Sequence, residues 1–212
     1  MKSKINKKIT EVIESPSFRK KLQWINRNYP NLKQEIPIRN AVLEEINKDY
    51  FSGNFGYRAF AEFQHPENSL KRVDLTLVDG SCAENKFYVE FKFQFSNDDI
   101  RFKKYRPVIE NNFEVHNSDL FILIVSHWDK EVKKEFDTDW DVTPDLNKYI
   151  SKTDCWKSNI PAHLESFNSA NWDMISLKTE DPYPVDYQFY FLKRKYENAV
   201  LNKLEEEKHQ FD

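Results

Sequence analysis

The chain has 212 residues, a net charge of −3, 15% aromatic residues and only three glycines. The many aromatic residues and few glycines exclude a low-complexity chain. The net negative charge argues against a protein that coats nucleic acid indiscriminately. Its two cysteines, Cys82 and Cys155, are too few and too far apart for a disulfide framework or a zinc site. No apolar run approaches the roughly 20 residues of a membrane span, and no signal peptide is evident, so we expect a cytoplasmic protein with no membrane contact.

The first 50 residues are predicted to be largely helical. Residues 1–36 are expected to form one or two helices, because Ile5 and Ile9 begin an apolar pattern of helical spacing and Ser15-Pro16-Ser17 is a typical helix start. A further helix is predicted from Pro37 to about Tyr50, since proline favours a first turn. Its apolar stripe consists of Ile38, Val42, Leu43, Ile46 and Tyr50.

Strand-like segments follow at 57–64, 72–78 and 86–95, after a glycine-containing turn at 51–56. Side chains alternate between the two faces of a strand, so Glu90 and Lys92 share one face of the third segment. Asp74 lies on the polar face of the second. If residues 79–85 connect these two strands as a hairpin, Asp74 and Glu90 come close together.

Two neighbouring carboxylates predict a site for a divalent cation, and a lysine beside them would suit chemistry on a phosphate. Adjacent carboxylates repel each other unless a cation lies between them, and Mg²⁺ prefers such oxygen ligands. A bound metal activates water and stabilises negative charge on a phosphate, and Lys92, two residues from Glu90, can reach the same phosphate.

The spacing of Asp74 and Glu90-Phe91-Lys92 resembles the signature of the PD-(D/E)XK nuclease superfamily, which includes restriction endonucleases and DNA repair nucleases. Val73 stands where the family often has proline. The resemblance implies that Asp74 and Glu90 are metal ligands, with the Phe91 carbonyl as a candidate third, and that Lys92 orients and helps to deprotonate the attacking water.

The same resemblance implies a further glutamate on the first core helix. Glu44 and Glu45 are both candidates, and Glu62 on the first strand is another. At about 100° per residue, Glu45 lies on the flank of the apolar stripe whereas Glu44 lies nearly opposite it. Glu45 is therefore the preferred fourth catalytic residue.

The elements after the Glu-x-Lys strand agree with the order of the family's core. Ser96 to Asp99 provide helix-capping side chains, and a helix interrupted or kinked at Pro107 is predicted over 100–111. The apolar run 120–125 is typical of a strand covered on both faces. Helix, three strands, helix and strand give the order αβββαβ, with a core of about residues 37–126.

Basic residues beside this motif are candidate phosphate contacts. They are Lys71, Arg72, Arg101, Lys103 and Lys104, of which the last three lie on the predicted helix that the family packs beside its site. A solvated helix face would explain any one of the helix residues equally well. These positions are the predicted nucleic-acid-binding residues, with DNA as the expected partner.

Residues 127–212 are interpreted as a C-terminal extension. A short helix is predicted over 130–136, a loop-rich segment over 138–161, strands over 172–177 and 186–192, and a terminal helix over 193–209. The aromatic side chains of this part can fill a core or a partner interface, or stack on bases. The histidines are scattered without metal-ligand spacing, and His127 is expected to have a capping or packing role.

Taken together, the sequence predicts a single α/β domain over 1–212 with a mixed central sheet flanked by helices and a restriction endonuclease-like core. The leading hypothesis is an endonuclease that hydrolyses DNA with Mg²⁺, or Mn²⁺ as a substitute, in restriction, defence or repair. Symmetric cleavage of both strands would imply a homodimer. The alternative is a catalytically inactive module of the same fold that binds a protein or a nucleic acid.

Overall fold

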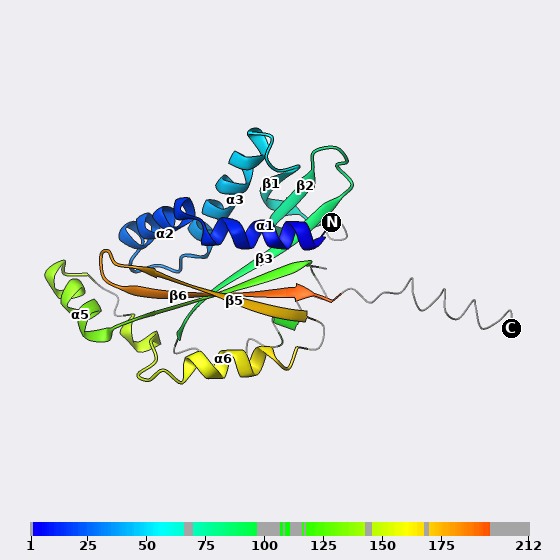
Figure 1. Cartoon of the computed structure of the whole chain (residues 1–212). Helices are drawn as coiled ribbons and strands as arrows, with labels where there is room; N and C mark the ends of the chain where they lie inside the picture. Colours follow the sequence, from blue (N-terminus) through cyan, green and yellow to red (C-terminus); the bar gives the residue numbers. More distant parts are fainter. Residues whose placement is uncertain are drawn as a thin grey trace, which may run out of the picture.

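The computed structural model describes residues 2–65, 70–96, 107, 109–110, 116, 118–142, 146–167 and 170–195. These residues form a mixed six-stranded sheet in the order β1-β2-β3-β4-β6-β5, with helices on both faces (Figure 1). The fold is therefore mixed α/β, as predicted. The helices are α1 (Lys2–Glu14), α2 (Pro16–Asn28), α3 (Glu35–Phe51), α5 (Lys130–Asp139), η2 (Asn147–Tyr149) and α6 (Trp156–Leu164), and the strands are β1 (Tyr57–Gln64), β2 (Arg72–Asp79), β3 (Lys86–Phe95), β4 (Leu120–Trp128), β5 (Ala170–Thr179) and β6 (Val185–Arg194).

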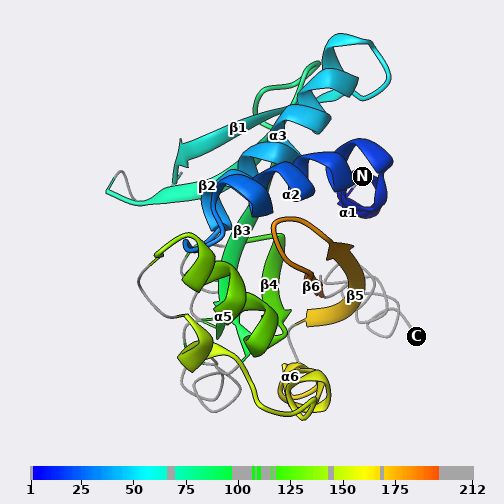
Figure 2. The same ribbon diagram turned by 90° about the vertical axis from the view of Figure 1, so that its left-hand side faces the viewer.

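Helices α1, α2 and α3 cover one face of the sheet. The α2 helix begins where the sequence indicated, because the Ser15 hydroxyl accepts a hydrogen bond from the Phe18 backbone N–H at 3.1 Å. The apolar side chains predicted to face the core from α1 are all buried: Ile5, Ile9, Val12 and Ile13. Figure 2 shows α3 lying across β1 and β2. This helix starts at Glu35, two residues before the predicted position.

The first three strands form an antiparallel meander, and β4 then runs parallel to β3. A parallel pair requires a crossover, which here spans the residues between Phe95 and Leu120. Pro107, Ile109 and Glu110 of this crossover have helical backbone, and Ile109 is buried. The remainder of the predicted helix over 100–111, including the cap at Asn97 to Asp99, lies outside the described residues.

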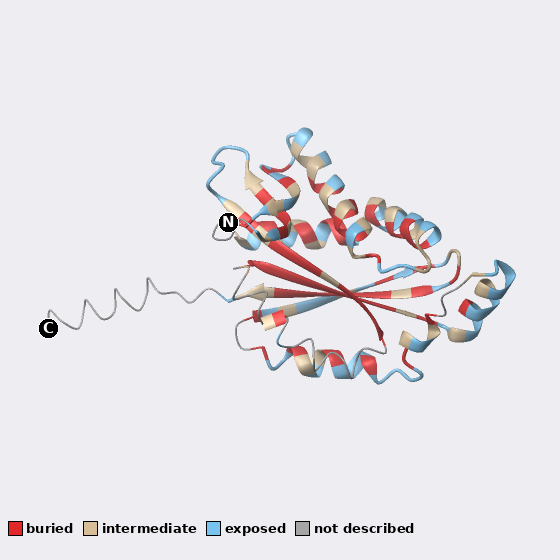
Figure 3. Cartoon of the chain, turned by 180° about the vertical axis from the view of Figure 1, so that it is seen from behind, coloured by how far each residue is buried: buried red, intermediate tan, exposed pale blue. Residues whose placement is uncertain are grey.

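Strand β4 is buried on both faces, as its continuous apolar sequence predicted (Figure 3). Ile122 and Ile124 pack in the larger core beneath α1, α2 and α3. Phe121, Leu123 and Val125 point to the other face and pack with Trp156 and its neighbours on α6. The central strands thus join two cores, one on each side of the sheet.

The C-terminal residues extend this sheet. Strands β5 and β6 are longer than predicted, and β6 pairs with β4 along its whole length. The prediction of a helix from Lys193 is wrong at its start, because Lys193 and Arg194 still pair with β5. Residues from 196 onward lie outside the described residues. Helix α6 begins within the loop predicted over 138–161 and ends beyond it, at Leu164. Pro161 and several polar residues obscured this helix in the sequence, but the fully buried Trp156 anchors it.

Cys82 and Cys155 are exposed and form no disulfide bond within the described part of the chain. No helix in the described ranges has the length and apolar character needed to cross a membrane.

Candidate active site

The hairpin of β2 and β3 places Asp74 next to Glu90. The strands pair as far as Leu75 and Val89, so the following position of the same register puts the two acidic residues opposite each other. Regular pairing stops at this point. The Phe91 backbone N–H instead donates to Asp74 Oδ2 at 2.8 Å, so that a carboxylate replaces the missing backbone acceptor. Glu90 lies beside Phe121 of β4 and is buried.

The environment of Glu90 favours its protonated form. Burial comes first among the causes, followed by the negative charge of Asp74 and hydrogen bonding to Asp74, and together they raise the pKa of Glu90 to about 9. Glu90 therefore carries a proton at neutral pH. At a protonated carboxyl group beside a second carboxyl group, a divalent cation can take the place of the proton.

Lys92 lies two residues beyond Glu90, on the same face of β3, and 36% of its side chain is exposed to solvent. Its ammonium nitrogen is 3.6 Å from Oε2 of Glu35, in the first turn of α3. The same carboxylate oxygen accepts a hydrogen bond from the Phe93 backbone N–H at 2.7 Å. Glu35 therefore connects the start of α3 to the strand that carries Glu90 and Lys92.

Arg39 reaches the acidic side chains from the same helix face as Glu35, because the two residues are four positions apart. Its side chain is buried, forms a close ion pair with Glu62 of β1, and has Nη1 3.9 Å from Oδ1 of Asp74. Glu62 has a φ of 51°, which is uncommon for a non-glycine residue within a strand. Such backbone strain is found most often at functional sites.

The structure does not bring Glu45 to this site. Its carboxylate accepts a hydrogen bond from the Ser17 hydroxyl at 2.9 Å and lies 3.0 Å from the ammonium of Lys21, so it connects α3 to α2. Glu45, placed by helical spacing on the flank of the apolar stripe, is buried, whereas Glu44 is exposed. The glutamate of α3 that does reach Lys92 is Glu35. It was missed because the helix was expected to start only at Pro37.

A histidine also reaches the carboxyl pair. His116 Nδ1 lies 3.1 Å from Oε1 of Glu90. The ring of His65, which is buried, stands edge-on to the His116 ring with 5.9 Å between centroids. Burial, and then the positive charge of Lys71, lower the pKa of His116, so its ring is neutral at neutral pH. The sequence carried no signal for this contact, since His65 and His116 are 51 residues apart.

The structure describes two of the five predicted nucleic-acid-binding residues, Lys71 and Arg72. Lys71 is half-buried, and its positive charge contributes to the lowered pKa of His116. Arg72 is exposed at the start of β2. Arg101, Lys103 and Lys104 lie outside the described residues.

The carboxyl pair fits a divalent cation in its chemistry. Among the described residues, no three side chains of His, Cys, Asp or Glu form a ready-made metal cluster. Oε1 of Glu90 is nevertheless buried without a hydrogen bond of normal geometry to any described residue. An oxygen in this state, next to a second carboxylate, has the donor character that Mg²⁺ or Mn²⁺ requires.

Comparisons of the chain with protein-family models, with curated proteins and with solved structures found no match. Any assignment of function therefore depends on the geometry of the site itself.

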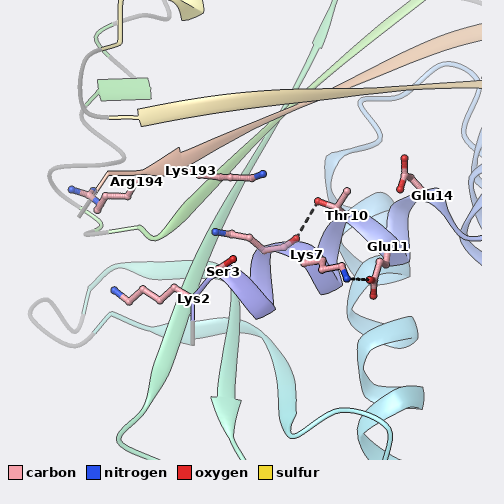
Figure 4. Close-up of a pocket in the computed structure, with 9 residues that line it drawn as sticks. Lys2, Ser3, Lys7, Thr10, Glu11, Glu14, Lys193 and Arg194 are labelled. Atoms are coloured by element: carbon pink, nitrogen blue, oxygen red, sulfur yellow. Dashed lines mark hydrogen bonds and ion pairs between the residues drawn. The ribbon is translucent and has the colours of Figure 1, made fainter. Parts of the chain in front are cut away.

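Two other features are separate from this site. A surface groove of about 530 Å³ lies between α1 and the end of β6, and several of its charged side chains already form ion pairs, such as Lys7 with Glu11 at 3.6 Å (Figure 4). This groove contains none of the predicted catalytic residues.

His127 has a packing role, as expected from the sequence. Its ring stacks on Trp156, and its Nδ1 lies 2.8 Å from the Ser96 hydroxyl oxygen.

Proposed function

We propose that this protein is a metal-dependent endonuclease that hydrolyses phosphodiester bonds of DNA. The observation that carries the proposal is the carboxyl pair of half-buried Asp74 and buried Glu90 on neighbouring strands, with Lys92 two residues beyond Glu90. A purely structural hairpin would normally place such acidic residues apart or in solvent, because burying one carboxyl group beside a second is costly.

Each residue of the pair has a defined task in this proposal. Asp74 and Glu90 hold Mg²⁺ or Mn²⁺, which supplies Lewis acidity and lowers the pKa of a coordinated water. Lys92 orients the attacking water and stabilises the negative charge that develops on the phosphate. Glu35, at 3.6 Å from the Lys92 ammonium, holds that side chain in place. Arg39 does the same for Asp74.

The order of elements supports the restriction endonuclease-like core as part of the proposal. Helix α3 is followed by the antiparallel strands β1, β2 and β3, and then by β4 parallel to β3. This agrees with the αβββαβ order that the resemblance implies, with the second helix falling in the crossover. Lys71 and Arg72 at the start of β2 provide positive charge for the DNA backbone. Symmetric cleavage of both strands would use a homodimer.

Cleavage of supercoiled plasmid tests this function directly. We expect the wild type to nick or linearise plasmid in Mg²⁺ or Mn²⁺ but not in EDTA, and Asp74→Asn to lose at least about 100-fold in rate because it lacks a metal-binding carboxylate. The matched control is Asp173→Asn, an exposed aspartate on β5, which should cut like the wild type. Equal cutting by Asp74→Asn, or cutting that persists in EDTA, would contradict the proposal.

A further inference from the structure

His116 and Glu90 bring two buried polar atoms close together. His116 Nδ1 and Glu90 Oε1 are 3.1 Å apart, yet neither atom has a hydrogen bond of normal geometry to any residue in the described ranges. Glu90 is 6% exposed, so this oxygen is largely shielded from bulk water. Buried polar atoms are normally satisfied, and each exception needs an explanation.

Two donor atoms at this separation can share one cation. Ligand atoms about 2 Å from a common metal ion lie roughly 3 Å from one another, as the nitrogen and oxygen do here. The ring of His116 packs edge-on against His65 and has its Nδ1 beside Oε1 of Glu90. Asp74, on the neighbouring strand, provides a further oxygen once its carboxylate turns from the Phe91 N–H toward the ion.

We infer that His116 is a metal ligand, and that it makes the site select a transition metal ion over Mg²⁺. This inference rests on the proposed function, since it adds a nitrogen ligand to the metal held by Asp74 and Glu90. Oxygen-only sites suit Mg²⁺, whereas an imidazole nitrogen raises affinity for transition metals. Because Co²⁺ binds more tightly than Mn²⁺ to most nitrogen-containing sites, it is the sharper probe.

Metal affinities of the full-length protein test the inference. Calorimetric titration with Co²⁺ and with Mg²⁺ is expected to show Co²⁺ binding at least about tenfold more tightly in the wild type. In His116→Ala, Co²⁺ affinity should fall by about tenfold or more while Mg²⁺ affinity changes much less. His116→Asn guards against a folding defect caused by the smaller side chain. His163→Ala, on α6, is the matched histidine control and should retain both wild-type affinities.

The X-ray absorption spectrum of the bound Co²⁺ supplies a readout that does not depend on activity. Imidazole scattering in the wild type that is absent from both His116 variants supports the inference. Imidazole scattering that persists in the variants, or equal losses of Co²⁺ and Mg²⁺ affinity, would overturn it, the latter by showing that His116 only positions Glu90. If the wild type binds neither ion, the proposed metal site fails and the inference falls with it.

Discussion

Replacing Lys92 with Met is expected to lower the rate of DNA cleavage roughly 100- to 1,000-fold, the usual cost of removing one group that stabilises charge in a transition state. Met preserves most of the length and volume of the side chain but has no charge. The Lys92 side chain is 36% exposed, and its ammonium nitrogen is 3.6 Å from the Glu35 carboxylate. Because exposed ion pairs contribute little, losing this pair should change the free energy of unfolding by less than about 1 kcal/mol. The comparison of single-turnover rates at saturating metal measures the effect.

The control for this variant is Lys86→Met, on the same face of β3 but at the other end of the strand. It should cut at the wild-type rate. Metal affinity should be unchanged in both variants, because neither lysine is a ligand. A Lys92→Met protein that cuts as fast as the wild type would exclude Lys92 from the chemistry, even if the metal site is correct.

The second large effect concerns Glu90 and the dependence of stability on pH. The folded protein holds Glu90 protonated, with its pKa raised from 4.5 to about 9. Between these values the folded state binds a proton that the unfolded state has lost, so the metal-free protein loses stability as pH rises from about 4.5 to about 9. The expected slope is on the order of 1 kcal/mol per pH unit.

Glu90→Gln removes this dependence, because the amide stays neutral at every pH and keeps a similar shape. The variant should therefore be more stable than the metal-free wild type at pH 8, by roughly a few kcal/mol, and similar to it at pH 4.5. Denaturant unfolding at several pH values measures the difference, with the exposed Glu84→Gln as control. A wild type whose stability relative to Glu90→Gln stays constant between pH 5 and pH 9 would show that Glu90 is ionised in the fold.

The sequence predicted the strands of this fold well because their patterns are local. Alternation of apolar and polar residues predicted β1 and β3 with their observed bounds, and the continuous apolar run predicted β4 as a strand buried on both faces. Helix α6 was missed because its stability comes from packing Trp156 against the sheet rather than from its own composition. The last two residues of β6, Lys193 and Arg194, were assigned to the terminal helix because charged residues also suit a helix surface.

Part of the candidate site was predictable for the same reason. Asp74, Glu90 and Lys92 belong to one hairpin, so strand alternation and turn length were enough to bring them together. Glu35 and His116 reach the site from a helix start and from a crossover, where contacts depend on how distant segments pack. Helical spacing alone selected Glu45, which does lie on the flank of the apolar stripe of α3. Its partners there are Lys21 and Ser17 of α2, not the residues of the candidate site.

The most direct test of the central claim is a calorimetric titration of Mg²⁺ into the metal-free protein at pH 7, in two buffers of different ionisation enthalpy. If the metal replaces the proton on Glu90, whose pKa is about 9, binding to one site should release close to one proton. In Asp74→Asn this binding should be lost, and in Glu90→Gln any binding that remains should release no proton. No binding by the wild type at millimolar Mg²⁺ or Mn²⁺, or binding that both variants retain, would contradict the account.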